Sequence, residues 1–144
     1  MKRGFTLLEL IIVIMIIGVL ATLGFASYGR MVEGSRGAEA RDVIGAMRKM
    51  AYAYYMRNGD NLAGLTNNDL SVGAGIPNAC AVTHYFSYGY ALGAGPAAIT
   101  FSASRCGPAG GGKNPDGPAA VANAVQLITN YAGGVDTWAR IAPY

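Results

Sequence analysis

The chain has 144 residues with a formal net charge of +3, and charged residues make up 13% of it. That length supports one modest domain and leaves little room for a large active-site cleft. So few charges argue against a disordered chain. No basic tract of the nucleic-acid-binding type occurs, so nucleic acid is not indicated as a partner. The apolar residues are concentrated near the N-terminus.

A charge-free run of 20 residues, Leu10–Gly29, follows the basic pair Lys2 and Arg3. As a helix it covers roughly 30 Å, the hydrocarbon thickness of a bilayer. The basic pair predicts, by the positive-inside rule, a cytoplasmic N-terminus and an outside location for the chain after Arg30. The alternative is a cleaved secretory signal, for which the run offers small residues: Ala21, Ala26 and Ser27.

Residues 30–57 predict that the same helix continues with one apolar side. Apolar residues recur at helical spacing, with further ones beside them: Val43, Met47, Met50 and Tyr54, flanked by Ile44, Ala51 and Tyr55. Charged residues fall three apart, and we expect them on the outer, water-facing surface: Arg30, Glu33, Arg36, Glu39 and Asp42. Asn58-Gly59-Asp60 predicts the end of the helix. Helical from Phe5 to Met56, the rod is about 78 Å long.

Residues 59–144 predict a small head built on an antiparallel sheet. A turn-rich connection at 61–79 precedes three strands with apolar or aromatic enrichment: His84–Leu92, Ala98–Ser104 and Ala124–Tyr131. Gly93–Pro96 is short enough for a hairpin loop, and Pro108–Pro118 is a long Gly/Pro loop. A sheet laid on the apolar side of the helix buries both apolar faces, so the predicted fold class is α+β.

Cys80 and Cys106 are the two cysteines of the chain. In a head outside the cytoplasm we expect them to form a disulfide, which stabilises the fold by about 3–4 kcal/mol. The alternative is two free, buried thiols. Their spacing does not match a C-x-x-C redox motif, and one histidine is too few for a zinc site, so no metal and no cofactor is expected.

The most specific pattern lies at the N-terminus. A basic leader ends at Gly4, the aromatic Phe5 follows, a single acid stands at Glu9, and the apolar run contains Gly18. This pattern resembles the leader and helix start of type IV pilins and of the related pseudopilins. The resemblance is strong over residues 1–29, generic over 30–57, and rests on architecture alone in the head.

The resemblance implies a precursor cleaved after Gly4 by a prepilin peptidase, which also methylates the new amino group of Phe5. The mature subunits then assemble with inner-membrane machinery into a helical homo-oligomeric filament. The implied segments are a leader at 1–4, a transmembrane and filament-core helix at 5–29, an amphipathic continuation at 30–58 and the head at 59–144. The implied location is the inner membrane, spanned once, before assembly and the extracellular filament afterwards.

Glu9 is an acid in apolar surroundings, where a central carboxylate costs roughly 2.5–3.5 kcal/mol. Such an acid requires a partner. Once the leader is removed, the nearest cation is the amine of Phe5, on the same chain or on a neighbour. We expect this charge pair to discriminate against misregistered packing. The alternative is that Glu9 only reaches the cytoplasmic interface.

Glycines within the predicted helix, Gly18 and Gly24 among them, each cost roughly 0.8–1.0 kcal/mol relative to alanine. One interpretation is close approach between helices, which small residues permit in membranes. The other is that this segment unwinds when the subunit leaves the bilayer. In pilins such unwinding is associated with a glycine and a proline; Gly18 fits, but Ala26 stands where many relatives carry the proline. Both interpretations stay open.

Two apparent motifs fail on inspection. Gly107–Lys113 imitates a phosphate-binding loop, but Asn114-Pro115 follows it in place of Ser/Thr and a helix. His84, Ser87 and Asp136 supply the residue types of a catalytic triad without a nucleophile-elbow context. We therefore expect no enzymatic activity.

The sequence thus predicts a pilin-like structural subunit of a type IV pilus, serving adhesion, motility or DNA uptake. A pseudopilin of a type II secretion system is the first alternative, and nothing in the sequence separates it from a pilus subunit. A single-pass, membrane-anchored binding protein is the second. Glu9 argues against that tether, because a lone anchor gains nothing from a buried acid.

Overall fold

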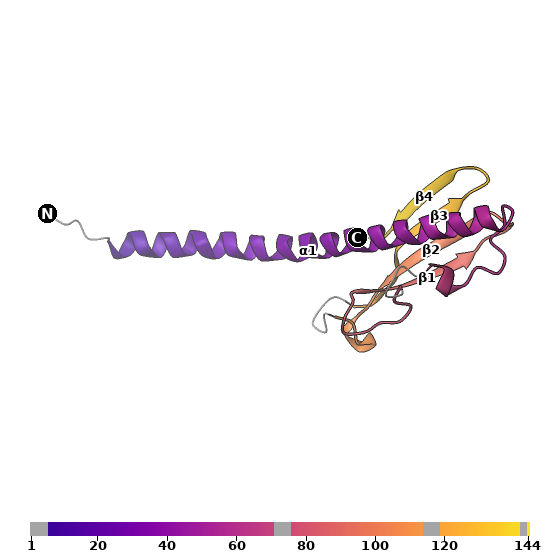
Figure 1. Ribbon diagram of the computed structural model, residues 1–144. Coiled ribbons are helices and arrows are strands. Elements are labelled where there is room, and N and C mark those ends of the chain that lie inside the picture. The colour runs from indigo at the N-terminus through magenta and orange to yellow at the C-terminus, as the bar shows by residue number, and fades with distance from the viewer. Residues whose placement is uncertain (1–5, 71–75, 114–118, 142–143) are drawn as a thin grey trace.

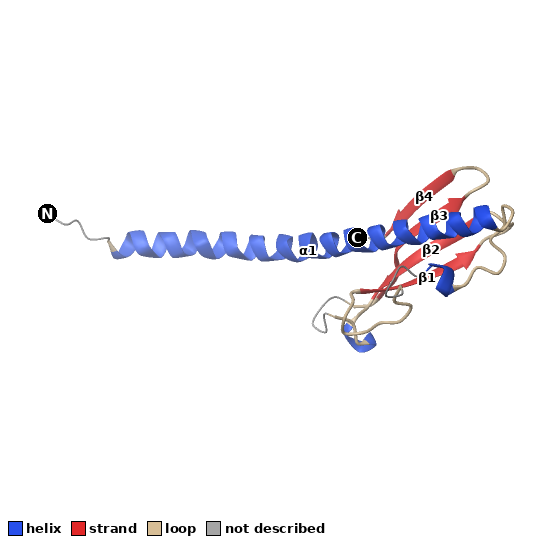
Figure 2. Ribbon diagram, viewed as in Figure 1, coloured by secondary structure: helices blue, strands red, loops and turns tan. Residues whose placement is uncertain are grey.

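One long helix and a four-stranded sheet form the framework of the described part of the protein, which also contains two short 3-10 helices, Asn67–Leu70 and Pro108–Gly110 (Figure 1). The computed structural model describes residues 6–70, 76–113, 119–141 and 144, apart from the side chain of Ala26. Helix α1, Leu7–Arg57, has 51 residues. At 1.5 Å per residue it is about 76 Å long. The sheet lies against its C-terminal half, while the N-terminal half projects alone (Figure 2). This is the predicted α+β, pilin-like architecture.

Local signals fix both ends of α1. At the start, the Thr6 hydroxyl accepts a hydrogen bond from the Glu9 N–H at 3.3 Å, and the Glu9 carboxylate accepts one from the Thr6 N–H at 3.0 Å. At the end, the Asn58 N–H donates to the carbonyls of Tyr54 and Tyr55, and Gly59 turns the chain away with φ +63°. The helix ends one residue beyond the predicted Met56; the predicted start, Phe5, lies outside the described residues.

The sheet is an antiparallel meander in the order β1-β2-β3-β4. Its strands are β1 (Phe86–Leu92), β2 (Ala98–Arg105), β3 (Val121–Asn130) and β4 (Val135–Arg140). The three predicted strands are confirmed with shifted ends. Strand β4 was not predicted, because all six of its residues are exposed and show no regular apolar alternation. This strand is held in place by pairing with β3 and by contact with the helix.

The core lies between the inner face of the sheet and one side of α1. The helix buries five apolar side chains there, each at most 7% exposed: Ala40, Ile44, Met47, Ala51 and Tyr55. The predicted apolar side is right in kind, but its centre lies one residue further along the chain. Val43, Met50 and Tyr54, predicted at its centre, pack at the margin of the core instead.

The predicted loop after the helix contributes to the core. Leu62, Leu65 and Leu70 are buried, and Asn67–Leu70 forms a 3-10 turn. The Leu62 N–H donates to the Pro96 carbonyl at 2.8 Å, which ties the segment to the β1–β2 hairpin. The described part of this connection is therefore packed against the core and is not a free loop. Its residues 71–75 lie outside the described part.

Candidate assembly site

The N-terminal half of α1 presents apolar side chains on every side. Each described side chain from Leu7 to Met31 is exposed, Phe25 to 80% and Leu7 to 76%. Among the described residues, α1 is the one helix long and apolar enough to cross a membrane, and none of its apolar window is buried. A core helix of a soluble domain would be covered by its own chain. This surface therefore requires lipid or other protein chains as its partner.

Glu9 sits at the first turn of this exposed half. Its Oε2 accepts hydrogen bonds from the Thr6 N–H at 3.0 Å and from the Thr6 hydroxyl at 2.9 Å. Among the described residues no donor reaches Oε1, so one carboxylate oxygen stays available to a cation. The Thr-x-x-Glu spacing is a capping box, which is a local sequence signal. Only an amine was expected as the partner of Glu9, so this signal was missed.

The predicted processing residues Gly4 and Phe5 lie outside the described residues. Pairing of Glu9 with the amine of Phe5 therefore stays a prediction. What the structure adds is a well-defined position for the acid, because the capping box holds it at the start of the helix.

Gly18 and Gly24 both lie within the continuous helix α1. A Cβ atom added at either position would meet nothing within 4 Å. At Gly24 the missing side chain leaves an apolar hollow, lined also by Ala21, Phe25 and Tyr28. Such a hollow accepts a side chain of a neighbouring helix, as small residues do at helix contacts in membranes. Unwinding at these glycines stays a prediction.

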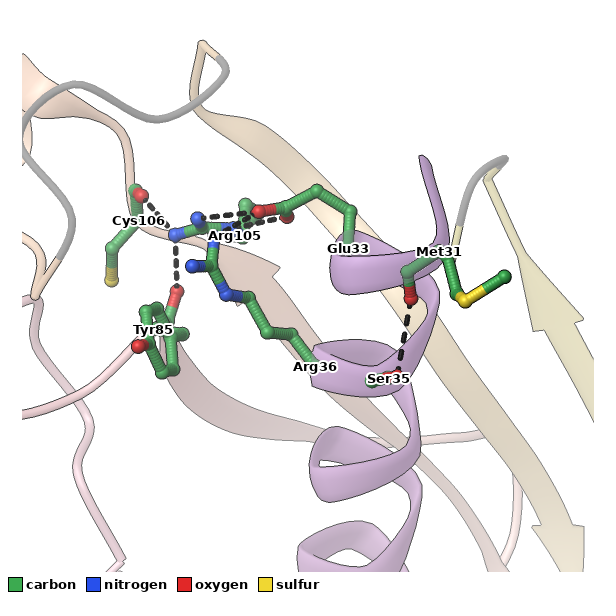
Figure 3. Close-up of polar contacts among 7 residues, drawn as sticks. All are labelled: Met31, Glu33, Ser35, Arg36, Tyr85, Arg105 and Cys106. Carbon is green, nitrogen blue, oxygen red and sulfur yellow. Dashed lines mark hydrogen bonds and ion pairs between the residues drawn. The ribbon is translucent and has the colours of Figure 1, made fainter. Parts of the chain in front are cut away.

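A buried ion pair joins the helix to the sheet where the exposed half ends (Figure 3). Arg105 donates to Glu33 twice, from Nε to Oε2 at 3.0 Å and from Nη2 to Oε1 at 3.2 Å. Arg105 is 1% exposed and Glu33 is 8% exposed. Arg36 also pairs with Glu33. The prediction that Glu33 faces water is wrong, because the sheet covers this side of the helix.

Arg105 holds more than the helix. Its Nη1 donates to the carbonyls of Tyr85 at 3.1 Å and Cys106 at 2.6 Å (Figure 3). Cys106 forms the predicted disulfide with Cys80. The Arg36 guanidinium lies 4.3 Å from the centre of the Tyr85 ring, a cation–π contact. The Arg105 guanidinium therefore connects helix α1, the residue that precedes β1 and the disulfide.

The ionisation of Glu33 follows from these contacts. Burial raises the pKa of Glu33. The hydrogen bonds and positive charges of Arg105 and Arg36 lower it by more than burial raises it, so that the pKa lies below its ordinary value of 4.5. The carboxylate is charged at neutral pH. Removing either partner would leave the other charge buried without compensation.

A second polar cluster attaches β4 to the helix. Arg48 forms a two-point ion pair with Asp136: its Nε donates to Oδ1 at 3.0 Å, and its Nη2 lies 2.7 Å from Oδ2. The Thr129 hydroxyl donates to the same carboxylate at 2.8 Å, and the Tyr131 hydroxyl donates to the Arg48 carbonyl at 2.8 Å. Asp136 thus has a structural role. Ser87 lies on β1, at the opposite edge of the sheet, so the residues of the apparent triad do not meet.

The loop that imitates a phosphate-binding motif has another function. A Cβ atom at Gly107 would lie 2.5 Å from the Ala120 backbone nitrogen, and one at Gly112 would lie 2.6 Å from the Cys106 Cβ. These glycines permit close chain packing beside the disulfide. Lys113 lies over the Tyr85 ring at 4.9 Å. Within the described ranges, no three His, Cys, Asp or Glu side chains gather as a metal site.

Comparison with known proteins agrees with this geometry. Residues 1–25 match the family described as the prokaryotic N-terminal methylation motif. The chain therefore carries a type IV pilin-like methylation motif on a pilin-like fold. It is similar to fimbrial protein EcpC of Eikenella corrodens, with 40% identity over 58 residues, which are 40% of this chain and 38% of that protein. No solved structure matches. Both matches fit the expectation of a structural protein rather than an enzyme.

Proposed function

We propose that the chain is a structural subunit of a type IV pilus, polymerised through its N-terminal helix. The observation that carries the proposal is the exposed apolar half of α1, which continues without a break into a folded head. A subunit that spans the inner membrane first and packs into a filament later uses that surface twice. In the bilayer, lipid covers it; in the fibre, the helices of other subunits do.

Processing prepares this transfer. Cleavage between Gly4 and Phe5 removes Lys2 and Arg3, which lowers the formal side-chain charge from +3 to +1. The prepilin peptidase that cuts there also methylates Phe5. Loss of the two basic residues removes the charges that would otherwise have to enter the apolar core of the fibre. The segments 5–29, 30–58 and 59–144 then act as filament core, connecting helix and exposed head.

Glu9 gives the assembly its register. Its carboxylate, held at the first helical turn, pairs with the Phe5 amine of an adjacent subunit. A subunit inserted out of register would leave both charges unpaired in apolar surroundings, which is strongly unfavourable. The pairing therefore admits one axial position for each incoming helix.

The similarity to a fimbrial protein favours a pilus over the pseudopilin alternative. The pseudopilin alternative predicts that the chain occurs in a short secretion fibre and is absent from long surface filaments. The single-pass tether predicts a monomer that stays in the membrane.

Intact mass measurement of filaments sheared from the cell surface tests the proposal. We expect a chain that lacks Met1–Gly4 and carries one added methyl group. The unassembled membrane fraction, processed by the same enzyme, is the matched control and should show the same mass. A mature start near Ser27 would identify a cleaved secretory signal and refute the proposal.

A further inference from the structure

One side of the second half of α1 faces away from the sheet and carries two charges. Asp42 lies two residues from the buried Ile44, and Lys49 lies two residues from the buried Met47. Two residues turn a helix by about 200°, so both charged side chains project away from the core. Both are exposed. We call the side of α1 that carries Asp42 and Lys49 its open side.

Asp42 and Lys49 have opposite charges, and neither has a counter-charge within the described residues. No salt bridge there involves either side chain. The two are seven residues apart, about two helical turns and about 10.5 Å along the axis, so they point the same way without meeting. Each charge therefore remains available to a group on another chain.

The same spacing of seven residues recurs in the shape of the open side. Gly24 leaves the apolar hollow that Phe25 and Tyr28 also line. Seven residues further on, Met31 projects from the helix and is 70% exposed. Gly24 precedes Asp42 by 18 residues, and Met31 precedes Lys49 by 18, which is about five whole turns in both cases. The hollow and the methionine therefore lie on the open side, in line with the acid and the base.

Two parallel copies of α1 offset by seven residues satisfy both spacings at once. Lys49 of the lower copy is then level with Asp42 of the upper copy. Met31 of the lower copy is level with the hollow at Gly24 of the upper one, where small residues permit close helix contact. Without an offset, each charge would face its own kind and each hollow would face a hollow, which is unfavourable.

We propose that the open side of α1 binds the open side of a second copy of this chain offset by about 10.5 Å, an inference that rests on the proposed pilus function. The sheet covers the opposite side of the helix, so the open sides face the interior of a fibre whose heads lie outside (Figure 2). Each subunit offers Asp42 to the copy below and Lys49 to the copy above. The contact is therefore heterologous and propagates along the fibre without closing into a dimer.

This contact is separate from the pairing of Glu9. A helical filament surrounds each subunit with several neighbours at different heights, so different pairs of residues join different neighbours. Glu9 concerns the start of the helix, and the open side concerns the stretch from Gly24 to Lys49.

Mixing two charge variants tests the contact. Asp42→Lys and Lys49→Asp should each lower fibre yield by at least about tenfold, because like charges then face each other at every contact. Co-expression of the two variants should restore fibres that contain both chains, because opposite charges meet again when the variants alternate. A mixture that yields no fibres would overturn the proposal. Both variants should melt as the wild type does in detergent micelles, and a lowered melting temperature would equally overturn it, since the charges would then act within one chain.

Glu39→Lys is the matched control for Asp42→Lys. Glu39 is also an exposed acid of α1 without a salt bridge among the described residues, but it lies ten residues from Lys49. Co-expression of Glu39→Lys with Lys49→Asp should leave the Lys49→Asp chain out of the fibres. Its incorporation at the level seen with Asp42→Lys would contradict the specific pairing.

Cysteine cross-linking measures the offset with both charges in place. Ala38 and Gly45 are seven residues apart beside the open side, and a Cβ atom added at Gly45 meets nothing within 4 Å. Sheared, oxidised filaments of full-length chain with Ala38→Cys and Gly45→Cys should give a ladder of multimers on a gel run without reductant. Ala38→Cys alone should stay monomeric, because its cysteines are about 10.5 Å apart along the axis, beyond the reach of a disulfide. Dimers of this single variant would show a contact without offset and refute the proposal.

The outcomes separate the contact from the function. Wild-type filaments that contain this chain, together with 38/45 cysteines that do not cross-link, would refute the contact and leave the pilus function standing. Surface filaments without this chain would refute the function and the contact together.

Discussion

The two halves of α1 share one continuous backbone and have opposite surroundings. From Leu7 to Met31 the described side chains are exposed, although most are apolar, whereas the half that ends at Arg57 buries one side under its own sheet. Helix formation alone therefore does not supply a tertiary partner. The second half finds its partner within the chain, and the first half must find one in lipid or in other chains.

The two acids that begin these halves show the same contrast. Glu33 is buried, and its counter-charge, Arg105, comes from the same chain. Glu9 is bound only through a local cap, and within the described residues it has no counter-charge. If this comparison is right, removing the charge of Glu9 will affect assembly, and removing that of Glu33 will affect folding.

The largest effect is expected for Glu9→Gln. The change keeps the shape of the side chain and removes its charge, so membrane insertion persists or improves. Recruitment into the fibre should fall to background, because the Phe5 amine of the adjacent subunit loses its counter-charge. Comparison of membrane and sheared surface fractions measures this split.

Thr6→Val is the matched control for Glu9→Gln. It removes the hydroxyl of the helix cap, which is worth about 1 kcal/mol, and leaves the acid in place. Fibre yield should survive this change. If Thr6→Val abolishes fibres as fully as Glu9→Gln does, Glu9 acts through the cap and not through charge pairing.

The next largest effect is expected at the buried pair. Glu33→Gln or Arg105→Met should destabilise the head by about 3–5 kcal/mol, because each leaves a buried charge uncompensated. Arg36→Met removes a more exposed contact of the same carboxylate and should cost clearly less. Thermal unfolding of full-length protein in detergent micelles, followed by near-UV circular dichroism, ranks the three.

The same pair gives the head a dependence on pH. The folded pKa of Glu33 lies below 4.5, so its stabilising contribution is complete above that pH and is lost as the pH falls through the folded pKa. The melting temperature of the wild type should therefore fall more steeply below pH 4.5 than that of Glu33→Gln. Parallel slopes would show that the ion pair does not govern acid stability.

The sequence made the local features of the fold predictable. Helical periodicity, the Asn58-Gly59 stop and the alternation in three strands depend on neighbouring residues, and the structure confirms them. Non-local features were harder. Strand β4 has no one-sided apolar pattern and depends on Arg48, 88 residues from Asp136. No local pattern reports such a contact.

The buried ion pair was missed, although two periodicities contain it. Glu33 lies seven residues before Ala40, on the line of the helix core, and Arg105 continues the inward alternation of Phe101 and Ala103 in β2. Each charge looked solvated by itself. Only two opposite charges at core positions of two elements, taken together, indicate a pair. The residues Gly4 and Phe5 could be assigned from the N-terminal pattern, and the structure does not describe them.

A smaller effect is expected from the disulfide. Reduction, or Cys80→Ser, should destabilise the head by about 3–4 kcal/mol by the loop-closure argument. The cut sites should lie around residues 107–113, where the chain packs against Cys106 through glycines. Limited proteolysis with and without reductant measures this. The exposed N-terminal half of α1 should be cleaved equally in both states, and unchanged cleavage of the head would argue against a structural disulfide.

The smallest effects sharpen the comparison within the second half of α1, where two glycines have opposite surroundings. A Cβ atom at Gly37 would lie 2.9 Å from the Tyr144 Cα, whereas at Gly45 it would meet nothing within 4 Å. Gly37→Ala should therefore destabilise the head by about 1–3 kcal/mol through overpacking. Gly45→Ala should stabilise it by up to about 1 kcal/mol, the helix-propensity gain of alanine. Thermal unfolding of the two variants under one set of conditions gives the sign. If both are stabilising, Tyr144 does not pack against the helix at Gly37.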